Sequence, residues 1–374
     1  MKLLVATGLY APDIGGPATY TAFLERHLPA RGIDLCVVPF GSVRTYPKII
    51  RHILYTLMLV RKGKDADMVY ALDTVSVGLP ALLASTFLRK PLYLRVPGDY
   101  AWEQGQQRFG ITDTLDEYLE KPSRPFFVRV LAWFQGRVAS RADRVIVPSE
   151  YLKRVTLRWG VDSSKVFVVH SAFNPVEIPP TRDELRARFK YEGFVVITAA
   201  RLVPWKGIGM VIDVVVALRD SGILISLDIV GDGVERQKLE EQIAERGAEN
   251  FVHLRGREEK QVLGERVKAA DVFVLNTSYE GLSHQLLEVM DIGTPLVTTP
   301  VGGNVELIDD EKEGLLVPFN AKEELTHALE RLRTDTALRM RLTEAARARV
   351  FDFREEQVVA KLLDLLSNAQ TVRG

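Results

Sequence analysis

Short apolar runs, many of them rich in β-branched residues, recur along the chain with longer amphipathic stretches between them. The pattern predicts strands at Leu3–Thr7, Met68–Ala71, Leu92–Val96, Arg144–Pro148, Phe194–Ala199, Leu224–Val230, Val272–Asn276, Leu296–Thr299 and Leu315–Val317. It predicts helices at Thr19–Ala30, Gly207–Arg219, Glu235–Arg246, Ser283–Met290 and Lys322–Arg333. Strands that are apolar on both faces are typical of parallel sheets, and their alternation with helices predicts doubly wound α/β sheets with right-handed crossovers.

The strand and helix series restarts after a proline-rich segment at residues 174–180. Because 374 residues suit two hydrophobic cores better than one, we expect two Rossmann-like domains, over residues 1–178 and 179–350. The remaining segment, 351–374, is helical by pattern over Phe351–Ser367. Periodicity does not say which domain that helix joins.

Composition places the chain among ordinary globular proteins, with 47% hydrophobic and 26% charged residues. The single cysteine, Cys36, cannot form an internal disulfide, which indicates a reducing compartment. The N-terminus lacks a signal-peptide core, and no apolar run is long enough to cross a bilayer. We therefore expect a cytoplasmic protein, peripheral on a membrane at most.

Charge is distributed unevenly although the net charge is zero. Residues 1–175 contain 23 Lys and Arg against 15 Asp and Glu, a balance of +8, and the remainder contains 26 against 34, a balance of −8. A basic half favours an anionic partner such as a membrane surface or a phosphorylated lipid, although uneven surface charge explains the count as well. No nucleic-acid-binding module is recognisable, so nucleic acid is not an expected partner.

Two stretches of the basic half combine cations with apolar side chains. Residues 35–64 contain no Asp or Glu, and within them Ile49, Ile50, Ile53, Leu54, Leu57 and Met58 follow helical spacing. This pattern is typical of an interfacial helix and equally of a helix packed on its sheet. The segment Pro122–Ala142 is also basic and aromatic. We favour a lipid phosphate at the inner face of a membrane as the partner of these stretches.

The most informative motif lies where the strand Val272–Asn276 ends and a helix begins. Glu280, Gly281, Leu282 and Ser283 occupy the carboxyl end of a parallel strand, where open α/β sheets bind ligands. Free N–H groups of the first helical turn suit a pyrophosphate, and Glu288 follows about two turns below Glu280. One carboxylate can then bind sugar hydroxyls and the other a ribose diol. A solvated loop glutamate and a helix-surface glutamate remain the alternative.

Other strand ends carry cations or glycines. Arg201 and Lys206 follow the strand Phe194–Ala199 and are placed to neutralise a diphosphate, although surface cations are common there. Gly231 ends another strand, and Gly15 and Gly16 follow the first one, where they permit close backbone approach to a phosphate or sugar. The dinucleotide fingerprint is missing, so a nicotinamide dehydrogenase is disfavoured.

With these motifs in this order, the sequence resembles glycosyltransferase family 4, retaining enzymes of the GT-B fold that build bacterial polysaccharides and glycolipids. The resemblance covers nearly the whole chain and rests on Glu280 with Glu288, Arg201 with Lys206, Gly15 with Gly16, and Pro148-Ser149-Glu150. It implies two Rossmann-like domains facing a cleft. It also suggests that the C-terminal helix crosses back onto the first domain.

The resemblance also implies a role for each motif. Arg201 and Lys206 would bind the donor pyrophosphate, while Glu280 and the amides of Gly281, Leu282 and Ser283 would hold the sugar and phosphate. Glu288 would hold the ribose, and backbone near Gly231, Arg255 and Gly256 would meet the nucleoside. Gly15 and Gly16 would lie against the diphosphate. Where the family often has a histidine near the sugar, this chain has Asp99 as the aligned candidate, which cannot replace imidazole in every role.

The resulting expectation is a retaining hexosyltransferase that moves a sugar from a UDP- or GDP-sugar to a saccharide or lipid-linked acceptor of a polysaccharide or lipopolysaccharide. The leaving phosphate would take the acceptor proton, and Arg201 and Lys206 would replace a metal, so no cofactor is expected. The Asp65-Ala66-Asp67 triplet precedes a strand and is interpreted as a turn. A nucleotide-sugar 2-epimerase on the same fold and a non-catalytic sugar-nucleotide-binding protein are the alternatives.

Overall fold

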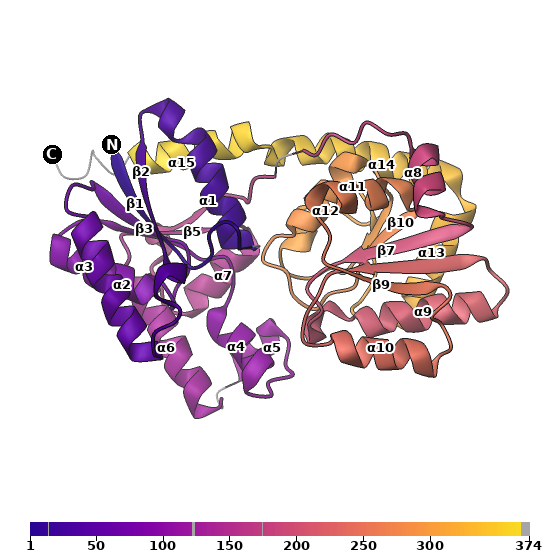
Figure 1. Cartoon of the computed structure of the whole chain (residues 1–374), viewed down its shortest axis with the longest axis horizontal. Helices are drawn as coiled ribbons and strands as arrows, with labels where there is room; N and C mark the ends of the chain where they lie inside the picture. Colours follow the sequence, from indigo (N-terminus) through magenta and orange to yellow (C-terminus); the bar gives the residue numbers. More distant parts are fainter. Residues whose placement is uncertain (14, 122–123, 174, 368–374) are drawn as a thin grey trace. The chain divides into compact units, whose positions relative to one another are not determined.

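The computed structural model describes residues 1–13, 15–121, 124–173 and 175–367. Ile14, Pro122, Asn174 and the tail 368–374, to which the sequence interpretation extends, lie outside the described residues. The chain divides into an N-terminal unit, Met1–Ser171 with Val358–Gly374, and a C-terminal unit, Ala172–Gln357. Each unit contains one six-stranded parallel sheet with helices packed against it (Figure 1).

The sheet of the N-terminal unit has the strand order β2-β1-β3-β4-β5-β6. Its strands are β1 (Lys2–Thr7), β2 (Asp34–Pro39), β3 (Met68–Ala71), β4 (Leu92–Arg95), β5 (Arg144–Val147) and β6 (Val166–Val168). Its helices are α1 (Gly16–His27), α2 (Lys48–Lys62), α3 (Gly78–Leu88), α4 (Tyr100–Arg108), α5 (Leu115–Glu120), α6 (Phe126–Arg141) and α7 (Glu150–Arg158). Figure 1 shows α1 on one side of this sheet and α2, α3 and α6 on the other.

The sheet of the C-terminal unit has the order β12-β11-β10-β7-β8-β9. Its strands are β7 (Phe194–Ala199), β8 (Ile225–Val230), β9 (Val252–Gly256), β10 (Val272–Leu275), β11 (Leu296–Thr298) and β12 (Leu315–Leu316). Its helices are α8 (Arg182–Phe189), α9 (Ile208–Asp220), α10 (Arg236–Glu245), α11 (Lys260–Ala269), α12 (His284–Ile292), α13 (Lys322–Thr334) and α14 (Thr336–Val350). Successive residues of β7 join different cores: Val196 packs with α9 and α13, and Ile197 packs with α12 and α14. Both faces of the strand are therefore apolar, as expected for a covered parallel sheet.

Three strands were missing from the set predicted from the sequence. They are β2 and β6, at the two edges of the first sheet, and β9, at one edge of the second. Most of their residues are only partly buried, and β9 includes the polar His253 and Arg255. An edge strand pairs with one neighbouring strand instead of two and is more exposed, so it does not need the continuous apolar run that marks a central strand.

The C-terminal helix is shorter than the sequence pattern predicted. Phe351–Phe353 forms a separate 3₁₀ turn, and Arg354 adopts an extended conformation before α15 (Glu355–Ser367) begins. The prediction of a continuous helix from Phe351 is therefore wrong at its start, because Phe353 is buried in the core and its carbonyl accepts the N–H of Phe173 at 3.4 Å. From Val358 onward, α15 belongs to the N-terminal unit. Within the described ranges, no helix is long and apolar enough to span a membrane.

Candidate active site

The sheet of the C-terminal unit reverses its winding between β7 and β10. These two strands are neighbours, with β8 and β9 beyond β7 and with β11 and β12 beyond β10. At such a switch point the connecting loops leave the carboxyl ends of the strands in opposite directions, and open α/β sheets bind ligands in the crevice between those loops. The motif with Arg201 and Lys206 follows β7, and the motif with Glu280 follows β10.

Backbone and side-chain hydrogen bonds join these two loops. The backbone N–H of Ser278 donates to the carbonyl of Trp205 at 2.8 Å, and Asn276 Nδ2 donates to the carbonyl of Gly207 at 2.8 Å. Gly207 has a φ of 49°, and a Cβ there would lie 2.5 Å from Asn276 Nδ2. Only glycine fits this position, and the loop that carries Lys206 is consequently fixed against the loop that carries Glu280.

Lys206 and Glu280 form an ion pair at the switch point. The Lys206 ammonium contacts Glu280 Oε1, and the two side chains are 10% and 17% exposed. Few water molecules can reach such a pair, so each charge depends on the other for its stabilisation. An anionic ligand that binds Lys206 must therefore compete with Glu280 or displace it.

Arg201 differs from Lys206 because its guanidinium is exposed. The guanidinium lies 5.8 Å from the centre of the Trp205 ring, which is itself buried. Within the part of the chain that the structure describes, Arg201 makes no ion pair. Its charge is therefore available to an anion that binds beside the loop after β7.

A third loop, after β11, packs against the backbone of the Glu280 motif. This loop was not identified from the sequence. A Cβ at Gly302 would lie 2.0 Å from the Glu280 carbonyl oxygen, and one at Gly303 would lie 2.3 Å from the Gly281 carbonyl oxygen. The Gly303 N–H donates to the Glu280 carbonyl at 2.9 Å. The available signal was the glycine pair that closely follows the strand Leu296–Thr299.

The helix α12 begins directly after this motif. Ser283 is its N-cap, and its hydroxyl accepts the N–H of Leu286 at 3.3 Å. Gly281, Leu282 and Ser283 are buried. The positive end of the helix dipole therefore lies in the segment that leaves β10, beside the Lys206 and Glu280 loops.

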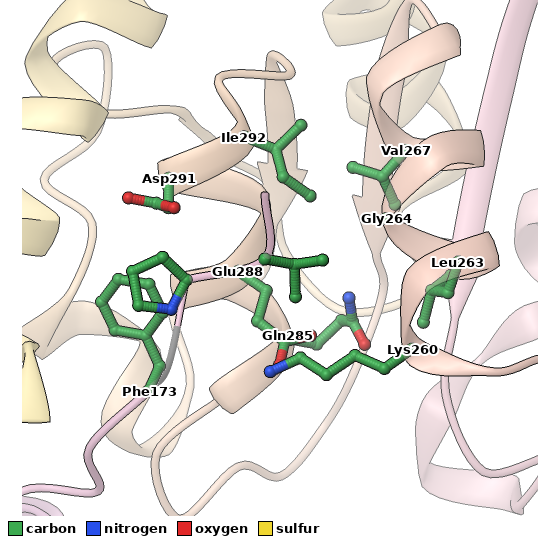
Figure 2. Close-up of a pocket in the computed structure, with 11 residues that line it drawn as sticks. Phe173, Lys260, Leu263, Gly264, Val267, Gln285, Glu288, Asp291 and Ile292 are labelled. Carbon is green, nitrogen blue, oxygen red and sulfur yellow. The ribbon is translucent and has the colours of Figure 1, made fainter. Parts of the chain in front are cut away.

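Glu288 lies further along α12, in a shallow pocket between α11 and α12 (Figure 2). Its Oε1 is 2.9 Å from Lys260 Nζ. The close-up shows the two side chains meeting near Gln285, with Phe173 on the opposite side. The structure thus places Glu280 at the switch point and Glu288 in a neighbouring pocket of the same unit, each paired with a lysine.

The residues after β8 and β9 meet through their backbone. The Gly231 N–H donates to the Gly256 carbonyl at 2.7 Å, and a Cβ on Gly231, where φ is 138°, would lie 1.9 Å from the Ala200 carbonyl. Arg255 turns its guanidinium to Asp228, with Nη2 2.8 Å from Oδ1. The Arg255 side chain is therefore held against the sheet edge by Asp228.

Asp228 is the centre of a buried charge cluster. Burial by itself would raise the pKa of Asp228, but hydrogen bonds from His253, Arg255 and Tyr191 outweigh it and lower the pKa to about 2. Arg266 adds a contact of 3.1 Å to Oδ2. This cluster ties β8 to β9 and α11 beneath the loop that contains Gly231.

The N-terminal unit has its own switch point, between β1 and β3. Gly15 follows β1 with a φ of 152°, and a Cβ there would lie 2.7 Å from Leu9 Cδ1, whereas a Cβ on Gly16 would meet nothing within 4 Å. Asp73, which sequence reasoning missed, follows β3 and accepts the N–H groups of Val75 and Val77 at 2.9 and 3.0 Å. Burial raises the pKa of Asp73. Its sequence signal was an acidic residue two positions after a buried strand.

Asp99 is the N-cap of α4 and is only 1% exposed. Its Oδ1 accepts the Trp102 N–H at 2.9 Å, and its Oδ2 accepts the Trp159 indole N–H at 3.1 Å. Burial raises the pKa of Asp99. The structure gives this carboxyl a helix-capping role, and contact with a sugar stays a prediction. The Asp65-Ala66-Asp67 triplet forms the predicted turn, where Asp67 Oδ2 accepts the N–H of Lys2 at 2.7 Å.

Two doubly wound parallel sheets, each in its own unit, make up the GT-B fold, and solved structures share this architecture. The HepE protein of Anabaena, solved with UDP and glucose, superposes with a TM-score of 0.78 at 20% identity over 98% of this chain and all of that one. Residues 14–177 match the family model described as Glycosyltransferase Family 4, and residues 182–349 match Glycosyl transferases group 1. The chain belongs to the family 4 glycosyltransferases.

Several relatives are bacterial glycosyltransferases. Alpha-D-kanosaminyltransferase of Streptomyces kanamyceticus is 30% identical over 181 residues, 48% of this chain and 47% of that protein. The lipopolysaccharide core biosynthesis glycosyltransferase LpsE of Rhizobium meliloti is 31% identical over 175 residues, 46% of this chain and 50% of its own. Each match spans about half the length of the relative.

Proposed function

We propose that this glycosyltransferase transfers a hexose from a UDP- or GDP-sugar to a hydroxyl of a cell-envelope polysaccharide, lipopolysaccharide or lipid-linked acceptor, with retention of configuration and without metal. The observation that carries the proposal is the convergence at the β7/β10 switch point of Arg201, Lys206, Glu280 and the N-terminus of α12. Cations and helix N-termini bind diphosphates, and a carboxylate binds hydroxyls, so both parts of a nucleotide sugar have partners there.

The proposed donor exchanges the Lys206–Glu280 ion pair for contacts of its own. The diphosphate binds Lys206 and the exposed Arg201, and Glu280 is then available to sugar hydroxyls. Glu288 binds the ribose hydroxyls, because it lies on the helix that follows the Glu280 motif, with one oxygen held by Lys260. This arrangement explains why two glutamates eight residues apart each have a lysine partner.

In the proposed reaction the acceptor hydroxyl attacks the anomeric carbon from the face that the diphosphate leaves. The departing phosphate oxygen takes the hydroxyl proton, so no protein nucleophile is required. Negative charge grows on the leaving diphosphate, and two cations in a poorly hydrated loop stabilise that charge more in the transition state than in the ground state. Arg201 and Lys206 thereby supply the charge that a divalent metal supplies in other enzymes.

The names of two relatives support the proposed acceptor class. One related protein takes part in lipopolysaccharide core biosynthesis and another, AmsK of Erwinia amylovora, in amylovoran biosynthesis. Nucleotide sugars and the single cysteine fit a cytoplasmic location for this chain. A nucleotide-sugar 2-epimerase would instead yield product from donor alone, and a non-catalytic protein would bind donor without turnover.

The test is thermal-shift measurement with UDP, GDP, ADP and their common sugar conjugates in EDTA, on the parent chain and on Arg201→Ala and Glu288→Ala. We expect one nucleotide to stabilise the parent, with the shift lost in both variants. Lys238→Ala, an exposed lysine on α10, is the matched control and should keep the shift. Absence of a shift with every nucleotide would contradict the donor site, and a shift that requires added Mg²⁺ would contradict metal independence.

A further inference from the structure

Three helices on one side of the N-terminal sheet contain no acidic residue. These helices are α2, α3 and α6, and α3 packs against both of the others. Exposed cations lie on or directly after them: Arg61, Lys62, Arg89, Arg129, Arg137 and Arg141. None of these cations forms an ion pair within the described part of the chain. On the outer surface of these helices, called here the α2/α3/α6 surface, all the charged side chains of the helices are therefore basic.

The α2/α3/α6 surface also exposes large apolar side chains. On α2, Ile49, Ile53 and Leu57 are spaced four residues apart and are more than half exposed, with Ile49 at 76%. Residues at this spacing share one face of a helix. The side of α2 that packs on the protein carries Tyr55 and Leu59, which are fully buried. The apolar stripe predicted from the sequence is therefore divided, and Ile49, Ile53 and Leu57 face outward.

Helices α3 and α6 continue the same pattern. Phe87 on α3 is 75% exposed and lies four residues after the exposed Leu83. On α6, Phe126 and Trp133 are exposed at a spacing of seven residues, and Arg129 and Arg137 fall on the same helical stripe. Aromatic rings between arginines on one helical face are typical of a segment that lies at the boundary of lipid and water.

We propose that the α2/α3/α6 surface binds anionic phospholipid bilayers, with its apolar side chains entering the headgroup region and its cations contacting lipid phosphates. Charge complementarity favours this partner, because every charged side chain on the three helices is basic. A second copy of the chain fits poorly, since a self-associating face would bring these like charges together. The proposal extends the proposed function to the place where a lipid-linked acceptor is met, but it does not depend on donor binding.

The first test is flotation of the full chain with vesicles of phosphatidylcholine containing 30 mol% phosphatidylglycerol, and with phosphatidylcholine alone. We expect binding to the anionic vesicles that weakens in high salt, because screening shortens the reach of the charges. Arg129→Gln, Arg137→Gln and Arg141→Gln should each lower the partition coefficient about fivefold, and about a hundredfold when combined. The matched control replaces Lys238, Lys322 and Arg333, exposed cations of the C-terminal unit, with Gln and should bind as the parent does.

The second test locates the bound surface by fluorescence. Of the four tryptophans, Trp102 and Trp205 are buried, Trp159 is partly buried with its indole N–H donated to Asp99, and Trp133 is 61% exposed. Brominated phosphatidylglycerol should quench the parent protein, and Trp133→Phe should lose most of that quenching while it still binds. Ile53→Ser with Leu57→Ser should weaken vesicle binding about tenfold, and Met340→Ser, an exposed apolar residue of α14, should not.

Three results overturn the proposal: no binding of the parent to anionic vesicles, equal binding by the arginine variants, or quenching that survives Trp133→Phe. A dimer in light scattering that Ile53→Ser with Leu57→Ser converts to monomer would assign the surface to a second copy instead. Nucleotide-induced thermal shifts, measured on the same variants, should equal those of the parent. If the parent itself shows no nucleotide-induced shift, the donor site is contradicted, and the lipid-binding result is unaffected.

Discussion

Both sheets are doubly wound, with one strand, β2, beyond β1 in the N-terminal sheet and two, β8 and β9, beyond β7 in the C-terminal sheet, and their switch points are chemically different. In the C-terminal unit the loops after β7 and β10 carry three charged side chains: the exposed Arg201 and the ion-paired Lys206 and Glu280. In the N-terminal unit the loops after β1 and β3 carry glycine and Asp73, whose carboxylate is bound by backbone N–H groups of its own turn. A switch point in a doubly wound sheet therefore positions loops, while the side chains at strand ends decide which unit binds charged ligands.

The largest expected effect tests the charged switch point. Lys206→Ala and Arg201→Ala should each lower turnover about 10²- to 10³-fold with the donor that thermal shifts identify, because each removes a cation that stabilises the leaving diphosphate. Steady-state kinetics checks this, with Lys238→Ala as a control for loss of positive charge alone. Variants within threefold of the parent would contradict a role for these cations in stabilising the leaving diphosphate.

Glu280→Gln separates the two members of that ion pair. The change removes the charge that holds Lys206, so affinity for the nucleoside diphosphate should stay the same or rise a few-fold, while turnover falls about tenfold to a hundredfold. Isothermal titration with the diphosphate and kinetics with the full donor give the two readouts. Equal losses in both would mean that Glu280 only positions the loop.

Glycine substitutions compare the two units through stability. Gly302→Ala should destabilise the protein by about 3 kcal/mol, because φ is 55° and the added Cβ would lie 2.0 Å from the Glu280 carbonyl. Gly16→Ala in the N-terminal unit should change stability by less than about 0.5 kcal/mol, since its Cβ would meet nothing within 4 Å. Urea unfolding measures both, and a mild Gly302→Ala would show that the supporting loop can move.

Buried carboxyls should give the two units opposite responses to acid. Asp228 has a lowered pKa of about 2 against an ordinary value of 3.8, so it stabilises the fold above pH 4 by about 2 kcal/mol, and this is lost as the pH falls through 2. Asp228→Asn should therefore destabilise the protein at pH 7, and the difference should shrink below pH 4.

Asp99 should show the smallest effect and the reverse sign. Because burial raises the pKa of Asp99, ionisation of this carboxyl opposes folding. The contribution of Asp99 to the free energy of unfolding therefore decreases as the pH rises above 3.8. Asp99→Asn keeps a capping side chain for α4 and should cost less than about 1 kcal/mol at pH 7. Urea unfolding between pH 3 and 7 compares it with Asp228→Asn. A large loss of turnover without loss of stability would instead support contact between Asp99 and the sugar.

The sequence by itself determined the fold class and the central strands. Strands such as β7 and β10 are covered on both faces, so burial requires an unbroken apolar run that is visible in the sequence. The loops at their ends could be predicted for the same reason, because a polar motif after a buried strand must lie at the sheet's carboxyl edge. The edge strands β2, β6 and β9 were missed because partial exposure permits mixed composition.

The tertiary structure alone decided which of the predicted side chains are engaged and which are exposed. Lys206 proved to be paired with Glu280, and Asp99 proved to accept the indole N–H of Trp159, because partners 74 and 60 residues away are brought together only by folding. The support of the Glu280 loop by Gly302 and the outward position of Ile53 have the same origin. Helical periodicity shows that apolar residues share a face, but only packing determines which face the protein buries.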